Sequence, residues 1–529
     1  MKSYRIALVG ILVLAFVLPA IPAGRRILWS SNEARFVLLA QDILDHGHWL
    51  IPELRGQLYL YKPQLFIWAI ALAALPAGRV SELSGAIPSL LSAVASVGAI
   101  AAIGTLLWNG PAGLLAGLIL ATAPPLFLYG HTSIPDMMLG AFLTWSLYWF
   151  LRAWRSGWAR GPLAGFYICV ALAVASKGPA GYAGLIAAAI TVVGSDGPRG
   201  LVRLRPGLGA LILIACALPW IVPYYLWSHG AFQSNVLRGE YAAWVFEGTL
   251  RARLEGFART LGTFLPWSIF LVAAPWWWWR APDDGRRRVL LWTATIWVLF
   301  VMSGKVRSHY PIPVYPLLAL LTGEFLARDR APRSRPLQVA VALAAVYAVA
   351  TAVLVLVNPL DLGSGEDTVL FPEARWERGI DAAVLILGAV VALLLARRGA
   401  WRAVTATVAL SLTVALVLSG ITYPARQARD YDVRPLVAAA TAHLAPGEAV
   451  VGYPDLPLPY DFYLRRPVVE IGTPREALNL LASSKPGQIL ITSRGNWDTL
   501  ATAASSRWRP LATHRAGGRE IVVAGSSGP

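Results

Sequence analysis

Long apolar stretches separated by short basic loops run through the chain up to about residue 421. Many of them approach the roughly 20 residues that an α-helix needs to cross a bilayer. About thirteen are predicted to span a membrane: Ile6–Ala23, Ile87–Leu107, Ala112–Tyr129, Met137–Leu151, Leu163–Ala175, Ala180–Val193, Leu208–Tyr225, Pro266–Trp279, Val289–Met302, Pro311–Ala327, Val339–Val357, Ala382–Ala396 and Val404–Ile421. The pattern predicts a mainly α-helical, polytopic membrane protein.

Arg and Lys in alternate loops give these spans a direction. Cytoplasmic loops of membrane proteins are enriched in both residues. Every loop assigned to the cytoplasmic side, apart from the Trp108–Pro111 turn, carries Arg or Lys. The N-terminus is then inside and the C-terminus outside. The short, proline-bounded stretch Pro63–Ala77 is predicted to lie at the membrane interface, because the later loops then alternate correctly.

The first apolar stretch has a second interpretation. Residues 1–24 have a basic start and an apolar core, which also fits a cleaved signal peptide. An uncleaved first membrane helix is favoured, because the apolar run is long and many further spans follow.

Two long loops and the C-terminal region interrupt the membrane pattern. The long loops, 24–62 and 227–264, both fall on the predicted outer side. Residues 422–529 alternate short β-rich segments with helix-like runs, which predicts a small extracytoplasmic α/β domain after a transmembrane domain of residues 1–421. No repeat with a period of 20–50 residues is evident.

Composition supports the membrane assignment and removes one class of partner. The 529 residues are 56% hydrophobic and 14% charged, against about 25% charged in soluble domains. The net charge of +17 would suggest nucleic acid for a soluble protein. Most of the Arg lies in short loops between spans, so no nucleic acid partner is predicted.

Cys169 and Cys216 both fall within apolar stretches, and neither a disulfide framework nor a zinc motif follows.

The first outside loop mixes charged and aromatic residues, as suits a segment at a membrane surface above a catalytic cavity. Cations on the outer side are informative because they depart from the usual charge bias. They are Arg35, Lys62, Lys177, Arg238, Lys305 and Arg307. Cations that converge on a cavity bind phosphate, and Arg does so with two parallel hydrogen bonds. Taken singly, each could instead contact lipid headgroups or water.

Acids on the same side are the candidates for catalysis, and they are Glu33, Asp42, Asp45, Glu53 and Asp136. Asp136 follows Pro135 at the outer start of a span, where an ionisable group is a functional candidate. It could also cap that helix. Glu33 could equally be an ordinary acid in the first turn of an interfacial helix.

Metal binding and nucleotide binding find little support. His46 and His48 lie beside Asp45, but residues two apart do not share a helix face. No metal site is predicted, although metal dependence stays open. His131 and His309 lie in other outside turns and could join a site. The chain has no Walker loop, GxSxG elbow or dinucleotide fingerprint.

The first outside loop resembles that of the GT-C membrane glycosyltransferases, particularly bacterial lipid A aminoarabinose transferases and protein O-mannosyltransferases. Their loop opens Asp-Glu-x-Arg-Tyr and continues G-x-W-x-x-P-x-x-x-G-x-x-Y-x-x-K-P-P-L-x-x-W. The matching residues here are Asn32-Glu33-Ala34-Arg35-Phe36, Gly47-His48-Trp49, Pro52, Gly56, Tyr59, Lys62-Pro63-Gln64-Leu65 and Trp68. Order and spacing hold without gaps.

Further matches and some departures extend over nearly the whole chain. The matches are Ser133-Ile134-Pro135-Asp136, Ser176-Lys177-Gly178-Pro179, Leu218-Pro219-Trp220, Leu265-Pro266-Trp267-Ser268 and Ser303-Gly304-Lys305 with Tyr310-Pro311 and Tyr315-Pro316. Asn32 stands where the family has its leading acid, and Tyr61 where it has the acid before its Lys. Arg238-Gly239-Glu240 replaces Arg-Glu-His, so a metal contact at the last two positions would be lost.

The resemblance implies a GT-C fold and a glycosyltransferase of the cytoplasmic (inner) membrane with its site on the periplasmic side. It would move a sugar from a polyprenyl-phosphate donor to a lipid or glycolipid acceptor such as lipid A. The implied donor-phosphate ligands are Arg35, Lys62, Arg238 and Lys305. The catalytic positions are Asn32, Glu33 and Asp136, with the last two competing as the working acid. No cofactor is required, since cations alone can stabilise a leaving phosphate.

Three alternatives stay open: a protein O-mannosyltransferase, a lipid or glycan transporter without catalysis, and a family member with a scaffold role. Transporters often carry inverted repeats and ionisable groups at mid-membrane. This chain shows no repeat, and its ionisable groups cluster at the outer helix ends, so an enzyme is favoured. The sugar and the acceptor are not specified by the sequence.

Overall fold

The computed structural model describes residues 2–227, 249–278, 282–301, 307–328, 335–357, 375–483, 487–502 and 508–526. The chain forms two compact units. Unit 1 comprises residues 1–24, 60–69 and 86–422, and unit 2 comprises residues 25–59, 70–85 and 423–529. The first loop and the C-terminal region, which are far apart in sequence, therefore belong to one compact unit.

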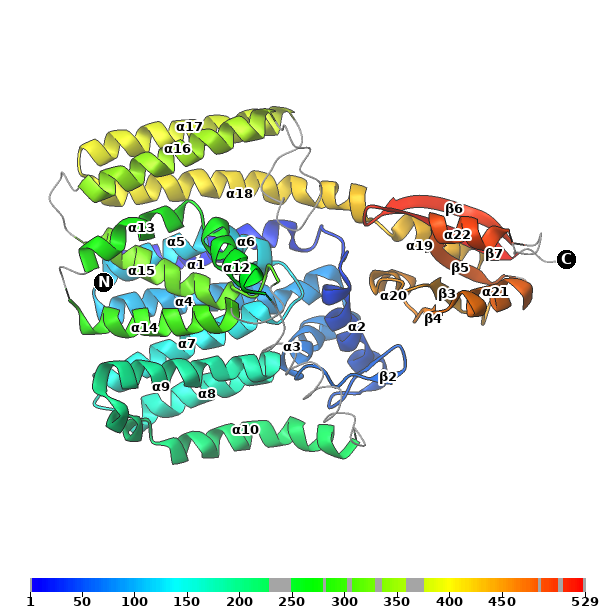
Figure 1. Cartoon of the computed structure of the whole chain (residues 1–529), viewed down its shortest axis with the longest axis horizontal. Coiled ribbons are helices and arrows are strands. Elements are labelled where there is room, and N and C mark those ends of the chain that lie inside the picture. Colours follow the sequence, from blue (N-terminus) through cyan, green and yellow to red (C-terminus); the bar gives the residue numbers. More distant parts are fainter. Residues whose placement is uncertain are drawn as a thin grey trace. The chain divides into compact units, whose positions relative to one another are not determined.

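Unit 1 is built from helices (Figure 1). They are α1 (Lys2–Ala23), α4 (Glu82–Leu107), α5 (Gly110–Ala121), α6 (Pro124–Gly130), α7 (Asp136–Arg155), α8 (Arg160–Lys177), α9 (Ala183–Asp196), α10 (Pro206–Trp227), α12 (Leu250–Thr263), α13 (Trp267–Trp278), α14 (Asp284–Val301), α15 (Tyr315–Ala327), α16 (Arg335–Val357), α17 (Arg375–Arg397) and most of α18 (Trp401–Tyr431), with 3₁₀ turns η2 (Gly178–Tyr182), η3 (Pro198–Leu204) and η5 (Ile312–Val314).

Small residues allow the central helices of unit 1 to approach closely. Helix α5 packs against α15, α7 against α8, α9 against α14, and α16 against α17. A Cβ added at Gly323 of α15 would lie 2.6 Å from the Cα of Ala116 in α5. Backbones in membranes pack through such small residues, because lipid supplies little hydrophobic force between helices.

Seven helices in the described ranges are long and apolar enough to cross a membrane, or eight with one bent pair. They are Lys2–Ala23, Glu82–Leu107, Arg160–Asp196, Pro206–Trp227, Arg335–Val357, Trp376–Arg397 and Trp401–Tyr431. A multi-pass membrane protein is therefore confirmed, whereas the predicted count of about thirteen spans is not. The predicted span Ala112–Tyr129 is two helices, α5 and α6, bent by 56°, because Pro124 and Pro125 cannot continue the helical hydrogen-bond ladder.

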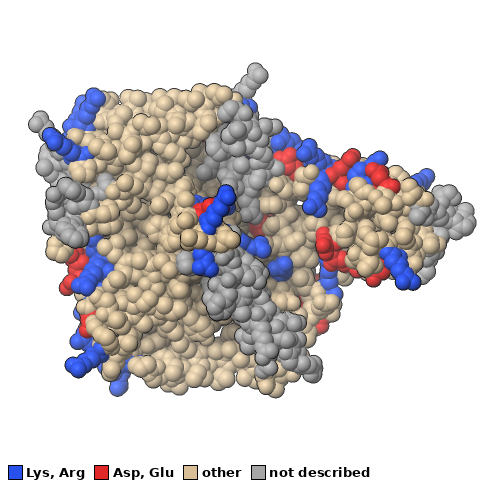
Figure 2. All heavy atoms as spheres, in the orientation of Figure 1, with Lys and Arg blue, Asp and Glu red and all other residues tan. Residues whose placement is uncertain are grey.

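The outer faces of several unit 1 helices are apolar. Only Gly209 and Tyr224 are buried in α10, whereas Leu211 is 67% exposed and Ile214 is 57% exposed. Figure 2 shows a largely uncharged surface over the helices, with charged side chains along the left margin of the view and a smaller group near its centre. Uncharged outer faces are what a bilayer solvates.

Unit 2 joins the first loop to an α/β region. The first loop and the residues after it supply α2 (Ser31–His46), β1 (Glu53–Leu54), β2 (Gln57–Leu58), the end of α3 (Leu65–Ala74) and η1 (Leu75–Ala77). The C-terminal region supplies α19 (Arg434–His443), β3 (Val450–Tyr453), α20 (Pro459–Leu464), β4 (Val469–Glu470), α21 (Pro474–Ser483), β5 (Ile489–Ser493), α22 (Arg494–Ala501), β6 (Trp508–Ala516) and β7 (Arg519–Ser526).

The C-terminal sheet has the strand order β4-β3-β5-β7-β6, with parallel pairing of β3 to β4 and β5 and antiparallel pairing of β7 to β5 and β6. Successive side chains of a strand point to opposite faces. Accordingly, Ile489 and Ile491 join a core with α19 and α20, while Leu490 joins a core with α21 and α22. Helices cover both faces, so this region has the predicted α/β architecture, within a unit that also contains residues 25–59 and 70–85.

The β1–β2 hairpin is tied to the C-terminal part of unit 2 through Arg55. The Arg55 guanidinium donates to both carboxylate oxygens of Asp461, at 3.0 and 2.6 Å, and to Glu470 at 2.6 Å. Burial alone would lower the pKa of Arg55, but these carboxylates raise it above its ordinary value. These two ion pairs fix the position of the β1–β2 hairpin within unit 2.

Candidate active site

Lys62 lies in the irregular segment before α3, and α10 holds that segment in place. The Tyr224 hydroxyl of α10 donates to the backbone oxygen of Lys62 at 2.8 Å and accepts a hydrogen bond from the Gln64 amide. Tyr224 and Gln64 are each 1% exposed, while Lys62 is half-buried. The buried side chains of Tyr224 and Gln64 therefore hold this segment in place.

Asp136 and Lys177 form an ion pair at the junction of two helices. Asp136 opens α7, where Pro135 takes the N-cap position without a side-chain cap, and Lys177 ends α8. The next residue, Gly178, has a φ of +74°, which glycine adopts readily and which ends the helix. Lys177 Nζ contacts Asp136 Oδ1 and lies 4.8 Å from the centroid of the Tyr310 ring. The predicted turn at Gly178 therefore ends α8 where Lys177 contacts Asp136.

Two further cations act on this pair. Lys62 and Arg307 both lie near enough to Lys177 to interact with it electrostatically. Lys62, Lys177 and Arg307 therefore form one group with the Asp136 carboxylate, in which the cations outnumber the acid. Such a group suits an anion.

His309 borders the same cluster in the loop between α14 and α15. It is 9% exposed. Burial is the main reason that its pKa falls from the ordinary value to about 4, and Lys177 and Arg307 lower it further while Asp136 opposes the change. At neutral pH His309 is therefore neutral and adds no charge to the cations around it. His131, the other candidate turn histidine, is buried against Phe127 with ring centroids 5.5 Å apart.

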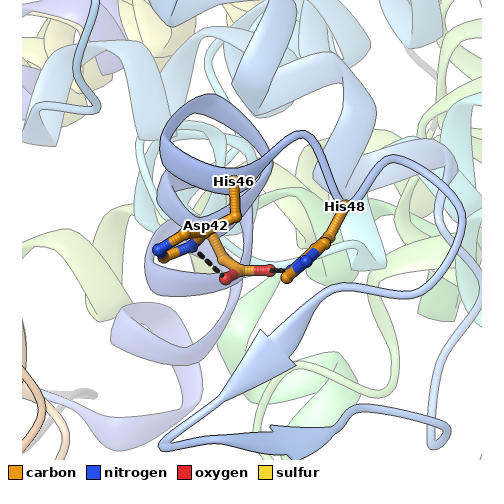
Figure 3. Close-up of side chains that lie close together, drawn as sticks. All are labelled: Asp42, His46 and His48. Atoms are coloured by element: carbon orange, nitrogen blue, oxygen red, sulfur yellow. Dashed lines mark hydrogen bonds and ion pairs between the residues drawn. The ribbon is translucent and has the colours of Figure 1, made fainter.

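Helix α2 carries the other sequence candidates, all within unit 2. Asn32 and Arg35 are half-buried on this helix. At its C-terminal end, Asp42 accepts from His46 at 2.8 Å and faces His48 at 3.0 Å (Figure 3). These three side chains are one group in the described residues with the composition and spacing to hold a metal ion.

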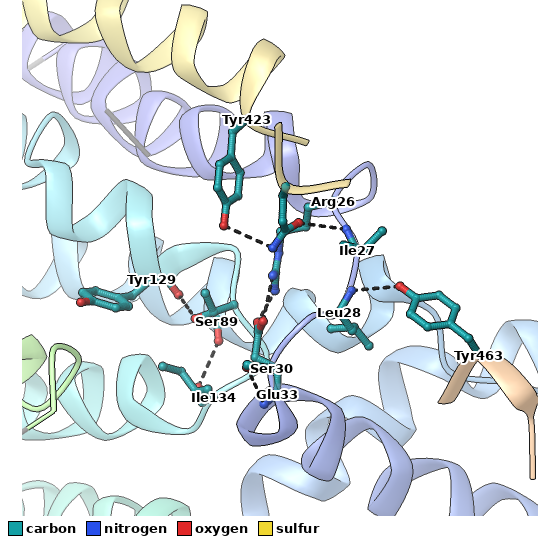
Figure 4. Close-up of polar contacts among 12 residues, drawn as sticks. Arg26, Ile27, Leu28, Ser30, Glu33, Ser89, Tyr129, Ile134, Tyr423 and Tyr463 are labelled. Carbon is teal, nitrogen blue, oxygen red and sulfur yellow. Dashed lines mark hydrogen bonds and ion pairs between the residues drawn. The ribbon is translucent and has the colours of Figure 1, made fainter. Parts of the chain in front are cut away.

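Glu33 is engaged in a buried ion pair. Both of its oxygens bind the Arg26 guanidinium, with Arg26 Nη1 at 2.9 Å from Oε2, and its backbone nitrogen donates to Ser30 Oγ at the N-terminus of α2 (Figure 4). The side chains of Arg26 and Glu33 are 1% and 5% exposed. Burial lowers the pKa of Arg26, but Glu33 more than compensates and raises it.

Two predicted phosphate ligands, Arg238 and Lys305, lie outside the described residues. Among the described ones, Lys62 joins the Asp136 cluster, while Asn32, Glu33 and Arg35 belong to the other unit. The sequence analysis assigned no role to Arg26, Tyr224 or Gln64, because a local residue pattern does not show which polar side chains pair in the fold.

A cavity of about 520 Å³ lies in unit 2 and has a different lining from the Asp136 cluster. Its charged lining residues are Asp42, Asp45, Glu53, Arg55, Arg79, Asp461, Arg465 and Arg466, together with His46. Neither Asp136 nor Lys177 lines it. Volume alone does not identify catalytic residues, so we place the candidate chemistry at the cluster of opposite charges.

The fold is the GT-C fold of membrane glycosyltransferases, as the first loop predicted. The structure superposes on that of ArnT from Cupriavidus metallidurans bound to undecaprenyl phosphate with a TM-score of 0.81, at 21% identity, covering 98% of this chain and 99% of that chain. The apo ArnT structure from the same organism gives a TM-score of 0.81 at 20% identity, covering 100% of this chain and 99% of that chain.

Sequence comparisons agree with this fold. Residues 61–223 match the model of the family described as dolichyl-phosphate-mannose-protein mannosyltransferase. An uncharacterized protein of Aquifex aeolicus (strain VF5) is 24% identical over 331 residues, which are 62% of this chain and 64% of that protein. The resemblance that the first loop carries is thus confirmed.

A second relative has a more specific name. The undecaprenyl phosphate-alpha-4-amino-4-deoxy-L-arabinose arabinosyl transferase of Yersinia enterocolitica (serotype O:8 / biotype 1B, strain NCTC 13174 / 8081) is 28% identical over 175 residues. The match covers 33% of this chain and 31% of that protein, so under two thirds of each of these two relatives is matched.

Proposed function

We propose that this protein is a glycosyltransferase that moves a sugar from a polyprenyl-phosphate donor to a lipid or glycolipid acceptor such as lipid A. The site would face the outer side of the cytoplasmic membrane, with the C-terminal α/β region on the same side. The names of the similar arabinosyl transferases and the undecaprenyl phosphate in the similar ArnT structure support this donor class.

The cluster of three cations around Asp136 carries the proposal. The donor is a phosphodiester with one negative charge, and the released polyprenyl phosphate is a monoester that carries close to two. Charge therefore grows on the phosphate as the bond to the sugar breaks. Lys62, Lys177 and Arg307 stabilise this growing charge more than they stabilise the bound donor, which is how an enzyme raises a rate.

The reaction is a displacement at the anomeric carbon of the sugar. The acceptor oxygen forms a bond to this carbon, the bond from the carbon to the phosphate oxygen breaks, and the electron pair leaves with the polyprenyl phosphate. If the acceptor is a hydroxyl, its proton passes to a carboxylate, for which Asp136 is the candidate. Glu33 is an unfavourable candidate, because both its oxygens already bind Arg26 in a buried pair.

Protein O-mannosylation is a second candidate, which the family match of residues 61–223 favours. It would use the same leaving group and the same cations, with a protein hydroxyl as the acceptor. The two candidates therefore differ in the acceptor and not in the charges around Asp136.

Mass spectrometry of cell-envelope lipids and surface proteins distinguishes these functions. Cells with the protein, cells without it and cells with Asp136→Asn should be compared. We expect a sugar adduct on a lipid in the first sample alone. An adduct on proteins instead would favour the second candidate, and identical lipids and proteins in all three samples would reject a transferase.

A further inference from the structure

The C-terminal end of α2 brings three potential metal ligands together. Asp42 and His46 are four residues apart, so they share one face of the helix. The helix ends at His46, and Gly47 has a φ of 73° in the left-handed region, where glycine is favoured. This turn sends the chain back, so His48 lies beside the same Asp42 carboxylate (Figure 3).

The potential ligand atoms of the three residues lie close to one another. Asp42 Oδ1 lies 2.8 Å from His46 Nδ1, and Asp42 Oδ2 lies 3.0 Å from His48 Nδ1. Ligand atoms of the three residues all lie within 4.8 Å of one another. Ligands about 2.1 Å from a tetrahedral zinc are roughly 3.4 Å apart, so a separation at the 4.8 Å limit would have to shorten by about 1.4 Å, which rotation of the exposed His46 side chain can supply.

The carboxylate at the centre of the group is already oriented. Asp42 Oδ2 also accepts from the backbone nitrogen of Glu53 at 2.8 Å. Outer hydrogen bonds of this kind fix metal ligands in place. The Asp42 side chain is 12% exposed, against 39% for His48 and 63% for His46. An ion can therefore reach the group from solvent without unfolding of the helix.

We propose that Asp42, His46 and His48 form a binding site for a first-row divalent cation of the zinc type. Two imidazoles and one carboxylate suit such ions, and three protein ligands leave a position for water. Each ring now turns Nδ1 toward the Asp42 carboxylate, which can only accept, so Nδ1 carries the proton in the metal-free group. On binding, each ring gives up its Nδ1 proton to solvent, carries its remaining or newly acquired proton on Nε2, and presents the Nδ1 lone pair to the ion. The site is separate from the Asp136 cluster and does not depend on the proposed glycosyl transfer.

The ion would fasten the end of α2 to the segment that leads into the β1–β2 hairpin. Asp42 and His46 belong to the helix, and His48 lies beyond it. The hairpin begins at Glu53 and carries Arg55, which pairs with Asp461. Zinc should therefore slow hydrogen exchange of the amides in residues 47–58 while leaving the C-terminal sheet unchanged.

Zinc and cobalt titration of the full-length protein in detergent tests the site. The protein is purified without a histidine tag and stripped with a chelator. We expect one zinc ion per chain by calorimetry and visible absorption bands of tetrahedral Co²⁺. His46→Ala, His48→Ala and Asp42→Asn should each weaken zinc binding at least about 10-fold, since even outer-shell changes cost 10- to 100-fold.

His443→Ala is the matched control, because His443 is an exposed histidine at the end of α19 in the same unit and is outside the group. It should bind zinc like the wild type. Size-exclusion profiles check that each variant is folded, and His46→Gln provides a milder change. Equal zinc affinity in wild type and in the His46 and His48 variants would overturn the proposal. So would a wild-type protein that binds neither ion, whatever the variants do.

Discussion

Lys177 Nζ pairs with Asp136 Oδ1 although the two residues are 41 positions apart in sequence. The pair joins the end of α8 to the start of α7 and has Lys62 and Arg307 as charged neighbours. Each partner therefore has an electrostatic role in the site and a structural one, and substitutions of both are needed to separate the two.

Asp136→Asn and Lys177→Met should each reduce sugar transfer by about 10²- to 10³-fold, the range for loss of one preorganised charge-stabilising group. The double variant should lose little more than either single one, because residues that act as a unit are not additive. Turnover of a labelled polyprenyl-phosphate sugar by purified protein measures this. Asp498→Asn, at an exposed site in α22, is the control, and full activity of Asp136→Asn would remove Asp136 from the site.

Lys62→Ala should raise the KM for the donor and lower kcat, whereas Lys62→Arg should keep most of the activity. A hydrogen bond to a charged group contributes about 1.5–3 kcal/mol, so roughly a 10- to 100-fold loss of kcat/KM is expected. Steady-state kinetics with a varied donor concentration measures the change. An unaltered KM and kcat in Lys62→Ala would show that this lysine does not bind the donor phosphate.

Tyr224→Phe should have a smaller effect through the position of Lys62. The variant loses the hydroxyl that donates to the Lys62 backbone at 2.8 Å. A neutral hydrogen bond contributes about 1 kcal/mol, which corresponds to about a 5-fold rise in KM for the donor. Tyr225→Phe, at the exposed next residue of α10, should bind the donor normally. Equal KM values in the two variants would mean that Tyr224 does not position Lys62.

Glu33→Gln distinguishes a structural acid from a catalytic one. It leaves the buried charge of Arg26 without its carboxylate, and breaking a buried ion pair costs about 3–5 kcal/mol. We expect a lower thermal unfolding temperature with near-normal turnover per folded molecule. Unchanged stability together with lost turnover would instead make Glu33 the working acid.

His309 should make stability depend on pH in acid. The unfolded side chain takes up a proton near pH 6.5, whereas the buried one does so only near its lowered pKa of about 4. Its contribution to stability is therefore complete above pH 6.5 and is lost as the pH falls from 6.5 to 4, by about 2 kcal/mol at pH 5. The unfolding temperatures of wild type and His309→Asn should therefore approach each other as the pH is lowered toward 5. Parallel curves of unfolding temperature against pH would contradict this role of His309.

The first-loop motif and the basic loops predicted the membrane fold correctly, because both depend on local residue order. The count of about thirteen spans stays a prediction, and Pro124 and Pro125 bend one of these spans. Lys62 and Asp136 are predicted site residues because of their places at the ends of predicted helices, and the structure brings both near Lys177. The hydrogen bonds of Tyr224 and the pair of Arg26 with Glu33 depend on tertiary packing, which residue spacing does not contain.

His46 and His48 show the same limit in a different way. The rule that residues two apart do not share a helix face holds only inside a helix. Because α2 ends at His46 and Gly47 reverses the chain, His48 returns to Asp42, and the acid in the group is not the adjacent Asp45.

Sugar transfer itself can be measured with purified protein, a labelled polyprenyl-phosphate sugar and an envelope lipid extract. With wild type, we expect free polyprenyl phosphate and a labelled acceptor lipid to appear together in equal amounts. Neither should appear with Asp136→Asn, whereas Asp498→Asn should match wild type. An intact donor after incubation with well-folded wild-type protein, or equal release by Asp136→Asn, would show that the Asp136 cluster does not catalyse glycosyl transfer.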